Sequence, residues 1–163
     1  MVEQHFLESA RMQFSAYKQL AEKAIEQLDE KYLFIRPAGD GNSLAIIIQH
    51  MAGNMLSRWT DFLITDGEKE WRKRDEEFET VIKGKDALMQ LWEVGWACLF
   101  SALEELHPSQ LEDTVTIRQQ PQTVLEAIHR QLTHYAYHVG QLVFYAKQLM
   151  GENFTSLSIP KKK

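Results

Sequence analysis

The chain has 163 residues, of which 44% are hydrophobic and 25% are charged, and its formal net charge is -5. This balance is that of a globular protein, and the length suits a single domain over residues 1–163. Because the basic residues form no cluster apart from the C-terminal lysines, nucleic acid is disfavoured as a partner. No membrane-spanning stretch and no secretory leader is recognisable, so we expect a cytoplasmic protein without a membrane contact.

Four segments carry apolar residues at alternating spacings of three and four, the pattern of amphipathic helices. They cover about residues 3–29, 43–65, 85–106 and 123–151. Asn42 or Ser43 is a suitable cap for the second segment, and Thr123 with Glu126 forms a capping box at the start of the fourth. Because no segment is rich in strand residues, we expect an all-α protein, most simply a four-helix bundle.

Two connections between these helices differ in composition. Residues 67–84, GEKEWRKRDEEFETVIKG, are dense in charges of both signs without sustained periodicity. We expect a surface connection with a short helical turn, its charges serving solvation. In residues 113–121, DTVTIRQQP, Val115 and Ile117 alternate with threonine, which predicts a brief extended turn.

The sequence HYAYH at residues 134–138 places two histidines on one face of the fourth helix. Two imidazoles at this spacing can bind one ion, although the spacing alone is weak evidence. On the second helix, His50 lies on a polar strip that also contains Ser43, Asn54, Ser57 and Asp61. If the two helices are neighbours, His50, His134 and His138 form a metal site. Otherwise His50 joins a hydrogen-bond network and the pair faces solvent.

Further polar residues share the side of the fourth helix that carries His134. They are Arg130, Tyr137, Gln141 and Tyr145. Arg130, Tyr137 and Gln141 are candidate catalytic residues, with Arg130 suited to hold a carboxylate. A solvated surface position explains Arg130 equally well, and packing between helices explains both tyrosines.

Three other features bear on the chemistry. Asn54 and Asp61 are candidates to orient ligating histidines, although either can be an ordinary surface residue. HYAYH lacks the glutamate of the HExxH motif, which disfavours a zincin-type peptidase. The single cysteine, Cys98, lies in the apolar run WACLF, so we expect it to be buried and inert.

The segments IIQHMAGNMLSRWTDFLITDGE and VLEAIHRQLTHYAYHVGQLVFY resemble the DinB-like superfamily of bacterial metalloenzymes, and the likeness spans nearly the whole chain. The resemblance implies a four-helix bundle with one histidine from the second helix and two from the fourth as metal ligands. These positions are His50, His134 and His138. It also implies zinc or nickel as the ion and a homodimer as the assembly.

Characterised members of that superfamily include thiol S-transferases that use bacillithiol and a mycothiol-dependent maleylpyruvate isomerase. Three neutral imidazoles leave a divalent ion with its full charge and an open position, as in catalytic zinc sites. We therefore expect a metal-dependent transferase that moves a low-molecular-weight thiol, such as bacillithiol, to an electrophile in detoxification or stress response. The alternatives are a non-enzymatic homodimer with a structural or regulatory metal, and a metal-dependent hydrolase.

Overall fold

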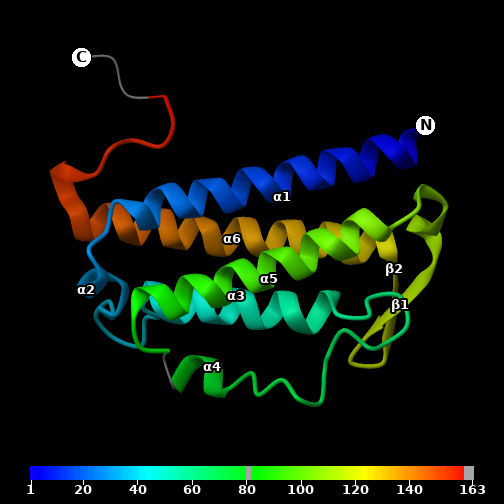
Figure 1. Ribbon diagram of the computed structural model, residues 1–163, viewed down its shortest axis with the longest axis horizontal. Coiled ribbons are helices and arrows are strands. Elements are labelled where there is room, and N and C mark those ends of the chain that lie inside the picture. The colour runs from blue at the N-terminus through cyan, green and yellow to red at the C-terminus, as the bar shows by residue number, and fades with distance from the viewer. Residues whose placement is uncertain (80–81, 160–163) are drawn as a thin grey trace.

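The computed structural model describes residues 1–79 and 82–159. Within these ranges the chain is mostly helical (Figure 1). The long helices are α1 (Val2–Glu26), α3 (Leu44–Trp59), α5 (Lys85–Glu105) and α6 (Val124–Met150). The short elements are α2 (Glu30–Leu33), α4 (Glu76–Glu79), the 3-10 helices η1 (Pro108–Glu112) and η2 (Gly151–Asn153), and the antiparallel strands β1 (Thr114–Ile117) and β2 (Gln120–Thr123). The helical class is confirmed, but the prediction of an all-α chain omitted this hairpin.

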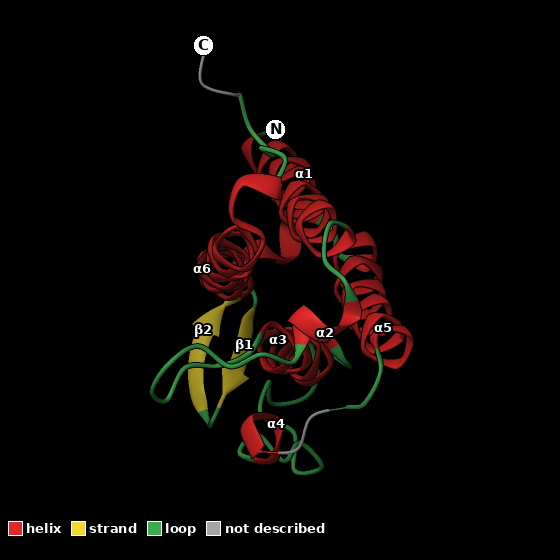
Figure 2. Cartoon of the chain, turned by 90° about the vertical axis from the view of Figure 1, so that its left-hand side faces the viewer, coloured by secondary structure: helices red, strands yellow, loops and turns green. Residues whose placement is uncertain are grey.

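The long helices lie side by side around a shared core, as the end-on view in Figure 2 shows. Helix α3 packs against α5 and α6, and α1 packs against the same two helices from the other side. The ring of Phe14 from α1 lies at the centre, with its centroid 6.3 Å from Trp59, 6.4 Å from Trp96 and 5.8 Å from Tyr135. Each long helix contributes one ring to this buried cluster, so a large apolar area joins all four.

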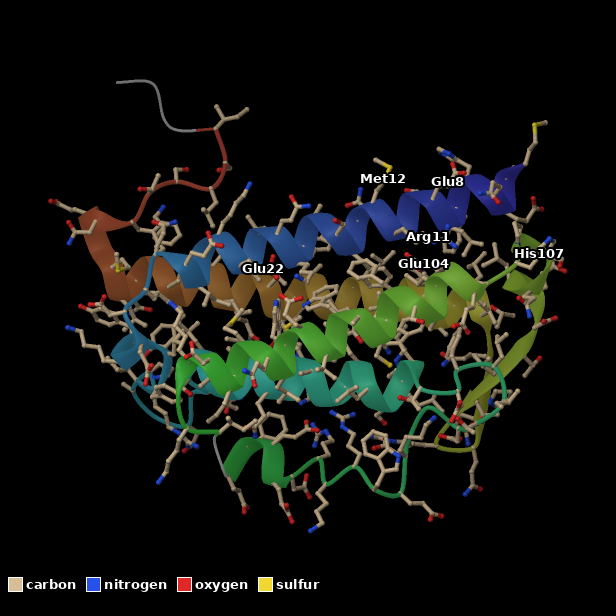
Figure 3. All side chains as sticks on the ribbon, viewed as in Figure 1. Glu8, Arg11, Met12, Glu22, Glu104 and His107 are labelled. Carbon is tan, nitrogen blue, oxygen red and sulfur yellow. The ribbon has the colours of Figure 1, made fainter. Side chains whose placement is uncertain are left out.

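Polar contacts also join α1 to α5 (Figure 3). The guanidinium of Arg11 donates to the carbonyl oxygen of Leu103, and Trp92 Nε1 donates to Glu22 Oε1 at 3.1 Å. These bonds satisfy groups that the interface between the two helices partly buries, so they add direction to an otherwise apolar contact.

Helix α3 begins as predicted and ends earlier than predicted. Ser43 Oγ accepts from the N–H of Ile46 at 3.3 Å, a side-chain cap of the first turn. The helix stops at Trp59, about six residues before the expected end, because Asp61 adopts a left-handed conformation with φ 48°. The ring of Phe62 packs against Trp59 in a tilted arrangement, with centroids 4.7 Å apart. This apolar residue therefore reaches the core from a turn, although its spacing continued the helical pattern.

The ends of the other helices agree with the predicted boundaries within a few residues. Helix α1 stops at Glu26, three residues before the expected position, and Leu28 is buried in the turn that follows. Thr123 and Glu126 form the predicted capping box at the start of α6, with bonds of 3.1 and 2.7 Å. No helix within the described ranges has the length and apolar character to cross a membrane.

The hairpin is fixed to the loop that follows α3. Arg118 and Gln119 form its turn, both with positive φ, and pair β1 with β2 where we expected only an extended turn. The carboxylate of Asp66 accepts from the N–H groups of Arg118 at 2.9 Å, Gln119 at 2.8 Å and Glu68 at 2.7 Å. One side chain therefore holds the hairpin turn against this loop and brings Arg118 beside Glu68.

Residues 67–79 of the charged connection cover α3 on the side opposite to α1 (Figure 1), and residues 80 and 81 of this connection lie outside the described residues. It contains the predicted short helical turn, α4. The prediction that its charges serve solvation is wrong for Arg72 and Glu77, which are both buried with only 9% of their surface exposed. The segment thus places two charged side chains against α3, where Glu77 contacts His50 and pairs with Arg72.

Candidate metal centre

The three predicted histidines come together where α3 and α6 pack. One ring nitrogen from each of His50, His134 and His138 lies within 4.8 Å of the other two. The Nε2 atoms of His134 and His138 are 3.0 Å apart, and the ring centroid of His50 lies 5.7 and 5.1 Å from theirs. The contact between the two helices, on which the predicted site depended, is present.

Glu77 fixes the ring of His50. Its Oε2 lies 2.9 Å from His50 Nδ1, and the carboxylate also accepts from Arg72 Nε at 2.8 Å and Nη2 at 2.9 Å. Burial raises the pKa of Glu77, but the bonds from His50 and Arg72 outweigh this and lower it below its usual value. A carboxylate only accepts, so Nδ1 of His50 carries the proton and Nε2 is left as the free nitrogen.

Two glutamines hold the other rings in the same way. Gln141 Oε1 lies 2.8 Å from Nδ1 of His138, and Gln131 Oε1 lies 3.4 Å from Nδ1 of His134. With Nδ1 donating to an amide oxygen in each case, the Nε2 lone pairs of both rings point toward one another. Side-chain oxygens therefore face Nδ1 of all three histidines, as they do around metal-ligating imidazoles.

Burial disfavours the charged form of both histidines on α6. It lowers the pKa of His134 to about 3, assisted by the nearby His138 and His50. Burial also lowers the pKa of His138, although the bond to Gln141 opposes the shift. Neutral imidazole is the form that binds metals, and a tetrahedral ion with bonds of about 2.0 Å holds its nitrogens roughly 3.3 Å apart. The spacing and chemistry of the three rings fit such an ion after a small adjustment.

Sequence reasoning missed Glu77, and the chain carried one indirect signal for it. Gly53 lies inside α3, one turn after His50, where glycine is unfavourable. A Cβ at this position would lie 2.3 Å from Oε1 and 2.9 Å from Cδ of Glu77. The absence of a side chain at Gly53 is what lets the carboxylate approach the helix.

A cavity of about 370 Å³ opens beside His50 and His134. Two of the predicted candidates, Arg130 and Tyr137, lie in its wall, and 62% of Tyr137 is exposed. The wall also includes four further arginines, Arg58, Arg72, Arg74 and Arg118. A molecule in this cavity would therefore meet cationic side chains next to the histidines.

The remaining candidates have other contacts. Gln141 positions His138 and donates to the hydroxyl of Tyr137 at 3.0 Å. Tyr145 donates to the carbonyl oxygen of Ile35 at 3.2 Å, which supports the packing interpretation of this residue. Asn54 lies in the cavity wall and accepts from the Tyr135 hydroxyl at 3.0 Å, so its Oδ1 contacts a tyrosine and not a histidine.

Asp61 and Cys98 lie at a second cavity, of about 460 Å³, near the end of α3. Since α3 already ends nine residues after His50, Asp61 is more than about 13 Å further along the chain and does not orient the histidine. Cys98 is partly exposed rather than buried, with Sγ 3.5 Å from Thr60 Oγ1. The other three histidines, His5, His107 and His129, lie outside the cluster.

The fold and the site define a mostly helical protein with a three-histidine cluster suited to hold a metal ion. Residues 1–163 match the family described as "Protein of unknown function (DUF1572)", and the chain belongs to this family. No curated protein and no solved structure matches the chain. Because the family description states no activity, the geometry of the site carries the functional argument.

Proposed function

We propose that this protein is a DinB-like four-helix bundle that binds one divalent metal ion, zinc or nickel, through His50, His134 and His138. One observation supports the proposal most strongly: the Nε2 atoms of His134 and His138 are 3.0 Å apart while both Nδ1 atoms face amide oxygens. Two unprotonated nitrogens at this distance repel each other. A shared cation turns that repulsion into two favourable bonds.

We further propose that the site is catalytic and transfers a low-molecular-weight thiol, such as bacillithiol, to an electrophile. No fourth histidine, cysteine or carboxylate of the described residues belongs to the cluster, which favours an open position over a closed structural site. A divalent ion with an open position supplies a Lewis acid that favours the thiolate form of a thiol at neutral pH.

The residues around the site would have different roles. Glu77 and Gln141 hold two of the ligating rings in position, and the cavity beside His134 admits the small molecules. Tyr137, with its ring centroid 4.9 Å from that of His138, forms part of the wall between the site and solvent. Homodimer formation and a role in detoxification or stress response belong to this proposal as implications of the family resemblance.

Elemental analysis of untagged protein tests the metal site. We expect about one zinc or nickel ion per chain, and its loss in a His134→Ala, His138→Ala double variant that keeps its helical circular dichroism. A His107→Ala, His129→Ala double variant is the matched control, because it removes two histidines outside the cluster. Absence of metal in the wild type, even after incubation with both ions, would refute the proposal.

Conjugation of a low-molecular-weight thiol to an alkyl halide tests catalysis. We expect turnover that disappears with a chelator and returns when the ion is restored. Bound metal without turnover of any thiol, together with a melting temperature that falls on metal removal, would support the non-enzymatic alternative instead.

A further inference from the structure

The cavity beside the histidines carries positive charge in a chain whose net charge is -5. Five arginines lie in its wall, Arg58, Arg72, Arg74, Arg118 and Arg130, and no aspartate or glutamate of the described residues lies there with them. Positive charge concentrated in a concave site strengthens the local electrostatic potential and attracts a negatively charged ligand.

The carboxylates behind the wall neutralise the buried arginines only in part. Glu68 Oε2 accepts from both Arg58 Nη2 at 3.3 Å and Arg118 Nε at 3.0 Å, so one carboxylate serves two guanidinium groups. The side chain of Arg58 is 10% exposed, and its Nε is a buried donor without a hydrogen-bond partner. Buried donors normally have acceptors, so this one N–H of Arg58 lacks the bond that its burial calls for, although Nη1 and Nη2 are bonded to Gly67 and Glu68.

Arg74 and Arg130, at the exposed end of the cavity, form fewer hydrogen bonds and ion pairs than the buried arginines do. The guanidinium of Arg130 has no hydrogen bond or ion pair with any described residue, and it lies one helical turn before His134. Arg74 contacts Asp75 at 3.4 Å, where the aspartate side chain is 94% exposed, and its guanidinium lies 5.2 Å from the ring centroid of Phe78. Neither Arg74 nor Arg130 is held by a buried ion pair, so both can turn toward a ligand.

We propose that this cavity binds the oxyanion group of a small molecule, a carboxylate or a phosphate, and holds it beside the histidine cluster. Arg58 forms the buried end of this oxyanion site, beside Arg72, whose Nε and Nη2 are held by Glu77. Arg74 and Arg130 close on the ligand from the exposed end. The volume of about 370 Å³ suits a ligand of modest size. The further step, that this ligand is the substrate or co-substrate of the metal site, rests on the proposed function.

Nitrogen-15 NMR titrations of the full chain, both zinc-loaded and chelator-treated, test the oxyanion site. The probes are inorganic phosphate, succinate and neutral succinamide at low ionic strength. We expect saturable shifts around the cavity with the two anions, weakened by added salt, and none with succinamide. Tighter binding of one anion over the other identifies the oxyanion group that the ligand carries, and either result supports the site.

Arg130→Gln and Arg74→Gln should each raise the dissociation constant about tenfold, the effect of one charge-assisted hydrogen bond. Lys147→Gln is the matched control. It removes one positive charge from the same helix, 17 residues and about 25 Å from Arg130, and should leave binding unchanged. Both arginines are exposed, so these variants should keep the fold.

Three results would overturn the inference: no saturable anion binding, equal binding of succinamide, or losses no larger than that of the control variant. The same anion titrations of the His134→Ala, His138→Ala double variant separate anion binding from metal binding. Anion binding that persists in this variant without metal supports the oxyanion site whatever the outcome for metal binding. Metal binding without anion binding refutes the inference and leaves the proposed metal site intact.

Discussion

Replacing Gly53 by alanine separates two opposing effects in one substitution. Glycine inside a helix costs about 1 kcal/mol relative to alanine, so helix propensity alone predicts that Gly53→Ala stabilises the protein. The structure predicts the reverse, because the new Cβ would lie 2.3 Å from Glu77 Oε1. Glu77 is held by His50 and Arg72, so its carboxylate cannot move aside without losing those bonds.

The size of the effect follows from the ion pair that is disturbed. Arg72 has a side chain only 2% exposed, and it forms an ion pair with Glu77. Depriving a buried ion of its partner costs roughly 3–5 kcal/mol. After the gain in helix propensity, Gly53→Ala should lower the free energy of unfolding by about 2–4 kcal/mol. Metal affinity should fall about 10- to 100-fold, because His50 loses the carboxylate that orients its ring.

Urea unfolding followed by circular dichroism measures the first effect, and competition with a chelator measures the second. Gly140→Ala is the matched control, because Gly140 is an exposed position of α6 with nothing within 4 Å of an added Cβ. That variant should be stabilised by up to about 1 kcal/mol. If Gly53→Ala is stabilised to the same degree and binds metal as the wild type does, the reasoning on Glu77 is refuted.

Three further changes test other contacts. Glu77→Gln should lower stability by roughly 3 kcal/mol in urea unfolding, whereas the exposed neighbour change Glu76→Gln should cost under about 0.5 kcal/mol; similar losses would contradict a buried role for Glu77. Slight burial raises the pKa of Asp66, but three backbone N–H donors lower it from 3.8 to about 2. Its contribution, about 1 kcal/mol after solvent screening, should be present above pH 4 and decline as the pH falls through 2, so Asp66→Asn should weaken the protein at pH 6 and have a much smaller effect at pH 2. Gly95→Ala gains about 1 kcal/mol of helix propensity, but its Cβ would lie 3.0 Å from Cα of Ala52 where α3 and α5 pack, and this overpacking should outweigh the gain and lower the melting temperature; an unchanged or raised melting temperature would contradict this.

The amino-acid sequence was sufficient for features that depend on neighbours along the chain. The capping box of Thr123 and Glu126 and the shared face of His134 and His138 follow from helical periodicity. The long helices were predictable for the same reason, since each buries a stripe that its own spacing reveals. The early end of α3 was not, because the spacing of Phe62 is the same whether it lies in a helix or packs back from a turn.

The tertiary structure alone decided the contacts between distant segments. His50 meets His134 and His138 only because α3 packs against α6, and helical periodicity does not specify which helices become neighbours. The pairing of Glu77 with His50 spans 27 residues, and in sequence Glu77 is one of several acids in a charged run. Its burial depends on the space left by Gly53 and on Arg72 beside it, so a long-range packing arrangement turns one surface-like charge into a partner of the candidate metal centre.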